Sequence, residues 1–149
     1  KRIKLKTDRR RNRPKKGFGL LMLDIDHFKN INDKYGHLTG DRVLREIAYI
    51  LVRAKHPIIG RSDSAFRYGG EEIAIYARDI RNKKDFKKYA ERVREGVSNH
   101  SFGIKEGVTI SIGGALLPQD ARKPKDLISL ADERLYKAKN TGRNKSIVY

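Results

Sequence analysis

Cysteine and tryptophan are absent from the 149 residues, and methionine occurs only once. The absence of cysteine excludes disulfide bonds and thiolate metal sites. Apolar runs near 20 residues, which a membrane-spanning helix requires, are also missing, and no secretory signal is visible at the start. What remains is a chain whose length fits one domain with one hydrophobic core, and we expect residues 1–149 to form a single domain.

Acidic residues are scarce relative to basic ones, and the net charge is +17. Residues 1–16 alone carry +9, which leaves +8 for the other 133 residues. Such a charge favours anionic partners such as nucleic acid, acidic membranes or nucleotides, but a solvated surface rich in ion pairs explains it as well. The basic stretch has few interleaved aromatic residues, which argues against single-strand binding. We interpret residues 1–16 as the remnant of a basic surface helix that ends near Pro14.

Apolar residues recur with the periods of both helices and strands. The expected strands cover residues 17–24, 65–68, 73–77, 108–112 and 146–149, and the expected helices cover residues 26–35, 39–54, 83–98 and 124–140. A hairpin over residues 65–77 interrupts the alternation of strand and helix. The order therefore predicts an α+β fold with a mixed sheet flanked by helices, rather than a doubly wound parallel sheet.

Two aspartates stand at the end of the first apolar strand. Asp24 and Asp26 follow the run GFGLLML, and a carboxylate at the end of a buried strand is costly unless something pairs with it. Magnesium is a suitable partner because it prefers hard oxygen ligands. We assign Asp24 to a metal and Asp26 to the capping of the following helix.

Two glycines and two glutamates occupy the expected hairpin tip. Gly69 and Gly70 let the backbone approach a bulky anion and tolerate positive φ, although a glycine pair alone is only a turn. Glu71 and Glu72 repel each other unless a cation or a proton separates them. Together with Asp24 they indicate one or two metals near a triphosphate.

Two cations stand near the end of the last expected helix. Lys139 and Arg143 share a face only if the helix continues, and Gly142 suggests that they straddle its end. Both could reach phosphates, with Arg143 in bidentate fashion. Complementing the helix dipole is the ordinary alternative.

Four sequence blocks, taken together, favour the functional interpretation of these residues over the ordinary structural one. The chain contains LDIDHFKNINDKYGHLTGD at 23–41, RYGGEEI at 67–73, VTISIG at 108–113 and ADERLYKAKNTGRN at 131–144. In order and spacing these blocks resemble the signature of the GGDEF family of diguanylate cyclases, over roughly residues 17–149. The resemblance implies a palm-like fold related to nucleotidyl cyclases, with the GGEE motif on a β-hairpin, and the condensation of two GTP into cyclic di-GMP by two facing subunits.

The resemblance also implies a role for individual residues. Asp24, the backbone carbonyl of Ile25 and the pair Glu71 and Glu72 would organise Mg²⁺, or alternatively Mn²⁺, and one of the two glutamates would help deprotonate the ribose 3′-hydroxyl. The residues expected to bind GTP are Lys29, Asn32, Asp41, Gly69, Gly70, Lys139 and Arg143. Of these, Asn32 and Asp41 would read the guanine edge. Phe28 and Leu44 are candidate walls for the base, with core packing as an equal alternative.

Three features depart from the family pattern. Ile73 stands where the fifth motif residue is usually Phe. Many relatives have an Arg-x-x-Asp product-binding site, of which Asp63 is present while Gly60 replaces the arginine and Arg61 is one residue off. This inhibitory site is therefore degenerate. The block that usually opens the family domain is absent, so we expect the chain to begin inside the domain's first helix.

Two other functions remain as alternatives. A non-catalytic GGDEF domain would bind GTP or cyclic di-GMP as a regulatory module, but the intact acidic pair argues against it. A nucleic-acid-binding protein is suggested only by the charge, since no recognition motif is present. We expect a cytoplasmic domain that acts as a homodimer, with an upstream sensory domain in a parent protein that is either free or membrane-tethered.

Overall fold

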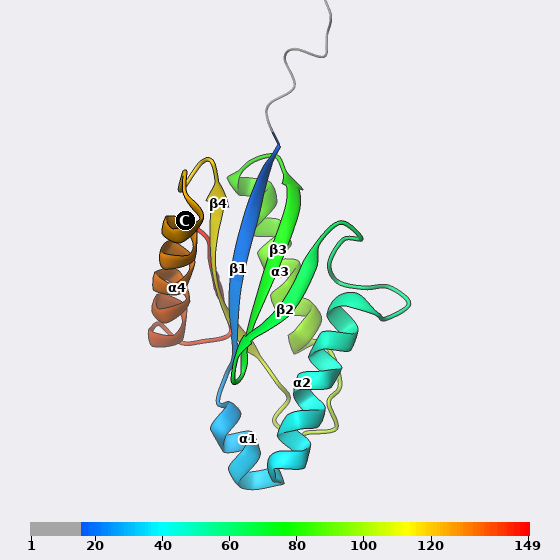
Figure 1. Cartoon of the computed structure of the whole chain (residues 1–149). Coiled ribbons are helices and arrows are strands. Elements are labelled where there is room, and N and C mark those ends of the chain that lie inside the picture. Colours follow the sequence, from blue (N-terminus) through cyan, green and yellow to red (C-terminus); the bar gives the residue numbers. More distant parts are fainter. Residues whose placement is uncertain (1–15) are drawn as a thin grey trace, which may run out of the picture.

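The computed structural model describes residues 16–149, so the helix expected over residues 1–16 lies almost wholly outside the described part (Figure 1). Its strands are β1 (Gly17–Ile25), β2 (Ser64–Gly69), β3 (Glu72–Ile80), β4 (Ile110–Leu117) and β5 (Ser146–Ile147). Its helices are α1 (Phe28–Tyr35), α2 (His37–Val52), α3 (Lys83–Ser98) and α4 (Pro124–Asn140). No helix among these residues is long and apolar enough to span a membrane.

The five strands form one mixed sheet in the order β2-β3-β1-β4-β5. β1 lies at the centre and pairs antiparallel with both β3 and β4, while β5 adds to β4 in parallel. Side chains on both faces of β1 are buried, which explains its continuous apolar run. The predicted α+β fold with a mixed sheet is confirmed.

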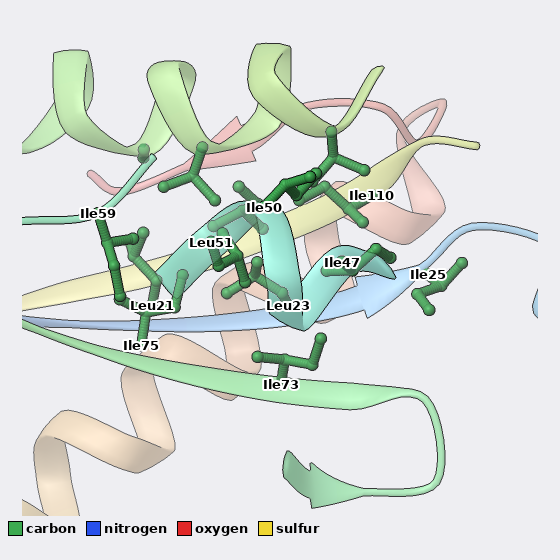
Figure 2. Close-up of a cluster of buried hydrophobic side chains, with 14 of the residues drawn as sticks. Leu21, Leu23, Ile25, Ile47, Ile50, Leu51, Ile59, Ile73, Ile75 and Ile110 are labelled. Carbon is green, nitrogen blue, oxygen red and sulfur yellow. The ribbon is translucent and has the colours of Figure 1, made fainter. Parts of the chain in front are cut away.

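Helices cover the sheet on both faces (Figure 1). On one face, α2 and α3 enclose the larger core, and Figure 2 shows Ile47, Ile50 and Leu51 of α2 against Leu21 and Leu23 of β1. On the other face, α4 packs against alternate residues of β1, β3 and β4. The residues of α3 that are buried share one side of the helix: Phe86, Tyr89, Ala90, Val93 and Val97.

The fourth strand was predicted at residues 108–112, but it covers Ile110–Leu117 and so includes two glycines. Gly113 faces α4 so closely that a Cβ there would lie 2.1 Å from the carbonyl oxygen of Ala131. Gly114 faces the other core, with Leu21 and Phe86 against it. The glycines therefore mark tight packing on both faces rather than the end of a strand.

Several elements meet at one end of the sheet (Figure 1). β1 runs into α1 there, and the turn between β2 and β3 lies at the same end. Gly36, with φ of 87°, ends α1 and donates its N–H to the carbonyl of Asn32, as predicted. The C-terminal end of α4 also lies there, because Lys139 reaches the end of β1.

Candidate active site

Asp24 is buried at the end of β1, with only 6% of its surface exposed. It pairs in register with Glu72 of β3 on one side and with Ser111 of β4 on the other. The Lys139 ammonium donates to its Oδ2 at 3.1 Å. Burial raises the pKa of Asp24 above its ordinary value, Lys139 opposes that rise, and the nearby charges of Glu71 and Glu72 add to it.

The chemistry of this end of the sheet suits a divalent cation. Asp24 is a buried carboxylate with the charges of Glu71 and Glu72 nearby, and carboxylate oxygens are the ligands that Mg²⁺ or Mn²⁺ prefers. Within residues 16–149, no group of three or more acidic or histidine side chains is arranged to hold a metal ion. Instead, the ammonium of Lys139 supplies the positive charge beside Asp24. A cation bound here would therefore compete with that ion pair.

The glycines of the hairpin tip were expected to let the backbone approach an anion and to tolerate positive φ. Neither Gly69 nor Gly70 is among the described residues with positive φ. At Gly69 the absence of a side chain leaves room for Glu72, because a Cβ there would lie 2.9 Å from Oε2 of Glu72. At Gly70 the backbone is uncovered, because nothing lies within 4 Å of an added Cβ. The Arg67 guanidinium donates to the carbonyl of Gly70 at 2.8 Å and holds the tip in shape.

Asn32 of α1 and Gly40 of α2 meet where the two helices pack. A Cβ at position 40 would lie 1.9 Å from Oδ1 of Asn32, so only glycine lets the amide lie there. Phe28 contacts the same position and is half-buried. Asp41, next along α2, is exposed.

A groove of about 420 Å³ lies between α2 and β2. Asp41 and Leu44 line it, together with Arg67 near the hairpin tip. Asn32 is not among the lining residues. The structure thus brings Asn32 and Asp41 to neighbouring turns without directing both into this groove.

The predicted phosphate-binding cations differ in their surroundings. Lys29 is exposed on α1 and pairs with Asp33 at 2.8 Å rather than with the residues at the end of β1. α4 ends at Asn140, so Lys139 and Arg143 lie on opposite sides of the helix terminus. Arg143 is half-buried in the loop that follows, with a φ of 60°.

Asp26 was predicted to cap the first helix, and this is wrong. The residue before α1 is His27, in a left-handed conformation and without a side-chain cap. The carboxylate of Asp26 instead accepts from the hydroxyls of Thr109 and Ser111, at 2.7 and 2.6 Å, and from the backbone N–H of Asn144 at 2.9 Å. The sequence signal for this arrangement is weak, because its partners lie more than 80 residues away.

Asp63 is held inside a turn. The N–H of Asp63 donates to the carbonyl of Gly60 at 3.0 Å, which closes a β-turn over residues 60–63. Its carboxylate accepts from the N–H groups of Gly60 and Arg78 and from the Tyr89 hydroxyl. Burial, reinforced by the charge and hydrogen bond of Asp63, raises the pKa of Tyr89. Asp63 thus has a structural role in the fold.

Comparison with known proteins identifies the family of the chain. The family model "Diguanylate cyclase, GGDEF domain" matches residues 1–145. The chain belongs to this family. It is 40% identical over 134 residues to the probable diguanylate cyclase DgcT of Escherichia coli, covering 87% of this chain and 28% of DgcT.

Solved structures of GGDEF domains superpose closely. The GGDEF domain of YfiN from Pseudomonas aeruginosa matches with a TM-score of 0.80 at 30% identity, covering 89% of this chain and 82% of that one. The active GGEEF domain of a diguanylate cyclase from Vibrio cholerae gives 0.79 at 30% identity, covering 94% and 87%. The chain spans between 28% and 35% of the length of the first curated relatives it matches.

Proposed function

We propose that this GGDEF domain condenses two GTP molecules into cyclic di-GMP and releases two pyrophosphates. The observation that carries the proposal is the meeting of Asp24, Glu72 and Lys139 at the end of β1, beside a glycine hairpin. An anionic group next to a cation and an open backbone suits a metal-bound triphosphate. Family membership supports the same reaction.

Different residues around Asp24 would bind the metal ion and the phosphates. Asp24, the carbonyl of Ile25, Glu71 and Glu72 would hold Mg²⁺, with Mn²⁺ as a substitute. Bound there, the ion would neutralise charge on the attacking oxygen and the leaving pyrophosphate. Gly69 and Gly70 leave room for the phosphates, because Gly70 has open space around its Cα.

Cationic side chains would contact the same phosphates from α1 and from the end of α4. Lys139 already lies beside Asp24, and Arg143 follows three residues after the helix ends. Lys29 pairs with Asp33 on the surface, where the pair is exposed and weak, so it can exchange partners when GTP arrives.

Guanine recognition is assigned to Asn32 and Asp41. A carboxylate accepts from the N1 and N2 donors of guanine, and an amide offers both a donor and an acceptor. The close fit of Gly40 against Asn32 places that amide against the residue that precedes Asp41 in α2. Phe28 and Leu44, both half-buried, would flank the base.

In the proposed reaction the 3′-hydroxyl of one GTP attacks the α-phosphorus of the other. The bond from that phosphorus to the oxygen that bridges to the β-phosphate breaks, and Glu71 or Glu72 accepts the hydroxyl proton. Repeating the step in the other direction closes the ring and releases the second pyrophosphate. Each domain binds one GTP, so two copies must face each other.

We further infer that product inhibition is weak, because Gly60 offers no side chain and Asp63 is engaged by three donors within the fold. We also propose that the domain works in the cytoplasm. A link to an upstream sensory domain is proposed because the curated relatives are about three times longer than this chain.

Incubation with GTP and Mg²⁺, with products identified by mass, tests the proposal. Cyclic di-GMP and pyrophosphate are expected. GTP binding without any product would favour the non-catalytic regulatory module, and hydrolysis to GMP alone at every protein concentration would exclude the cyclase.

A further inference from the structure

The loop after α4 contains three consecutive residues with positive φ. Gly142 follows the helix with φ of 116°, and the N–H of Arg143 returns to the carbonyl of Ala138 at 3.1 Å. This is the hydrogen bond of a Schellman helix end. The next two residues, Arg143 and Asn144, are also left-handed, with φ of 60° and 42°. Asparagine tolerates this region, but arginine adopts it rarely.

Asn144 is held from two sides. Its backbone N–H donates to Oδ2 of Asp26 at 2.9 Å, and its side-chain oxygen accepts from the Arg94 guanidinium of α3 at 3.0 Å. Arg94 is in turn fixed by Glu91 at 2.9 Å. These contacts bring β1 and α3 onto a residue that immediately follows Arg143.

The side chain of Asp26 is held in place by burial and by hydrogen bonds. It is 5% exposed, and the hydroxyls of Thr109 and Ser111 orient both of its oxygens. Asp26 directly follows β1, and Ser111, which pairs in register with Asp24, donates to its carboxylate, so the two aspartates are neighbours in space. Asp24 contacts Lys139 and Asp26 contacts Asn144, so neighbouring carboxylates support the two cations assigned to the triphosphate.

We propose that Asp26 and Arg94 are positioning residues which, by holding Asn144 from both sides, fix Arg143 where it contacts the GTP triphosphate. The inference rests on the proposed function, in that Arg143 is taken as a phosphate contact. It assigns to Asp26 a task distinct from metal binding and from helix capping.

Hydrogen bonding, not charge, is the property that the proposal requires of Asp26. Asp26→Asn keeps an oxygen for the N–H of Asn144 and presents an amide to the Ser111 hydroxyl, which can accept. Asp26→Ala leaves that N–H without its partner. Arg94→Ala loosens the same loop from the α3 side, and Glu133→Ala removes an exposed carboxylate of α4 as a matched control.

The test measures the Kd of GTP with Mg²⁺ for these variants, alone and combined with Arg143→Ala. Asp26→Ala should weaken GTP roughly tenfold in the parent chain and less than about twofold in the Arg143→Ala background. Arg94→Ala should behave similarly, Asp26→Asn should restore most of the affinity, and Glu133→Ala should have no effect.

Equal losses in both backgrounds would overturn the proposal, because Asp26 would then act independently of Arg143. A loss in Asp26→Asn as large as in Asp26→Ala would also overturn it and would indicate a direct role for the charge. If Asp26→Ala fails to fold, the GTP affinities of Arg94→Ala and Asp26→Asn still test the proposal. Absence of turnover with intact GTP binding would contradict the cyclase but leave this comparison valid, whereas absence of GTP binding would contradict both.

Discussion

At the scale of single residues, the carboxylate pair of the hairpin tip is a cost to the fold. Glu72 lies opposite Asp24 in register, and its charge contributes to the raised pKa of Asp24. Proteins keep such repulsion where the charges have a function. Removing Glu72 should therefore not lower the free energy of unfolding, while it should lower the catalytic rate.

Glu72→Ala is expected to lower kcat by at least roughly 100-fold, because charge stabilisation at the reacting phosphate is lost. The melting temperature should stay the same or rise, since repulsion with Asp24 is relieved. Steady-state kinetics and thermal melting of the same samples measure both. Wild-type turnover would remove Glu72 from the mechanism, and a large fall in melting temperature would assign it a structural role.

Selectivity for the base should depend on Asp41. Adenine has an acceptor at N1 and no N2 amine, so Asp41 would face a lone pair in place of two donors. Asp41→Ala should lower kcat/KM for GTP by roughly 10- to 100-fold while barely changing that for ATP. Asp126→Ala, which removes an exposed carboxylate of α4, serves as the control. Equal use of GTP and ATP by the unmodified chain would refute the assignment.

At the scale of secondary structure elements, the packing of α4 on β4 depends on one glycine. A Cβ at Gly113 would lie 2.1 Å from both the carbonyl oxygen of Ala131 and the backbone nitrogen of Leu135. These are backbone atoms, so the helix itself would have to move.

Gly113→Ala should therefore reduce the free energy of unfolding by about 3 kcal/mol, the upper range for overpacked cores. Gly70→Ala is the matched control, because no atom lies within 4 Å of its added carbon, and it should change stability by less than about 0.5 kcal/mol. Urea unfolding of both variants gives the comparison. Similar stabilities would show that α4 is free to shift away from β4.

The connection between β4 and α4 depends on a buried ion pair. Asp120 accepts from the Arg134 guanidinium at 3.0 Å and from Lys83 at 2.8 Å. Burial alone would raise the pKa of Asp120, but these hydrogen bonds outweigh it and hold the pKa below its usual value. A lowered pKa adds stability above the unfolded value near 3.8, and that stability disappears as the pH falls through the folded pKa.

Asp120→Asn should accordingly cost about 2 kcal/mol at pH 6, and the difference from the unmodified chain should shrink below a pH of about 4. Denaturant unfolding across this pH range measures it. A difference that does not vary with pH would mean that the charge of Asp120 contributes nothing.

The elements themselves were largely predictable, because helices and strands follow local periodicity. α3 and α4 have the predicted bounds, and the hairpin lies where the glycines placed it. The extent of β4 and the partners of Asp26 were not predictable, because they depend on tertiary contacts. Gly113 looks like a break in a strand until the helix that packs on it is known.

The candidate site also has features that the sequence predicts and features that depend on tertiary contacts. The meeting of Asp24 with Glu72 follows from strand pairing, and it could be expected once the hairpin was recognised. The contact of Lys139 with Asp24 joins residues 115 positions apart and was not predicted, although the family resemblance assigned both residues to one site. The turn around Asp63 and the role of Arg94 left no local signal in the sequence.

At the scale of the whole molecule, we propose that two GTP-loaded copies meet to form one product. In the proposed mechanism each domain binds one GTP beside Asp24 and Lys139, so one domain would supply only one set of phosphate contacts. At low protein concentration, encounter of two domains limits the rate, so activity should depend on the population of dimers.

The most direct test is the initial rate of cyclic di-GMP formation, measured at saturating GTP and Mg²⁺ over a wide range of protein concentrations. The rate should rise close to the square of the protein concentration while monomers dominate, and become linear once dimers prevail. Cyclic di-GMP formed in strict proportion to protein at concentrations where the chain is monomeric would contradict the two-copy mechanism.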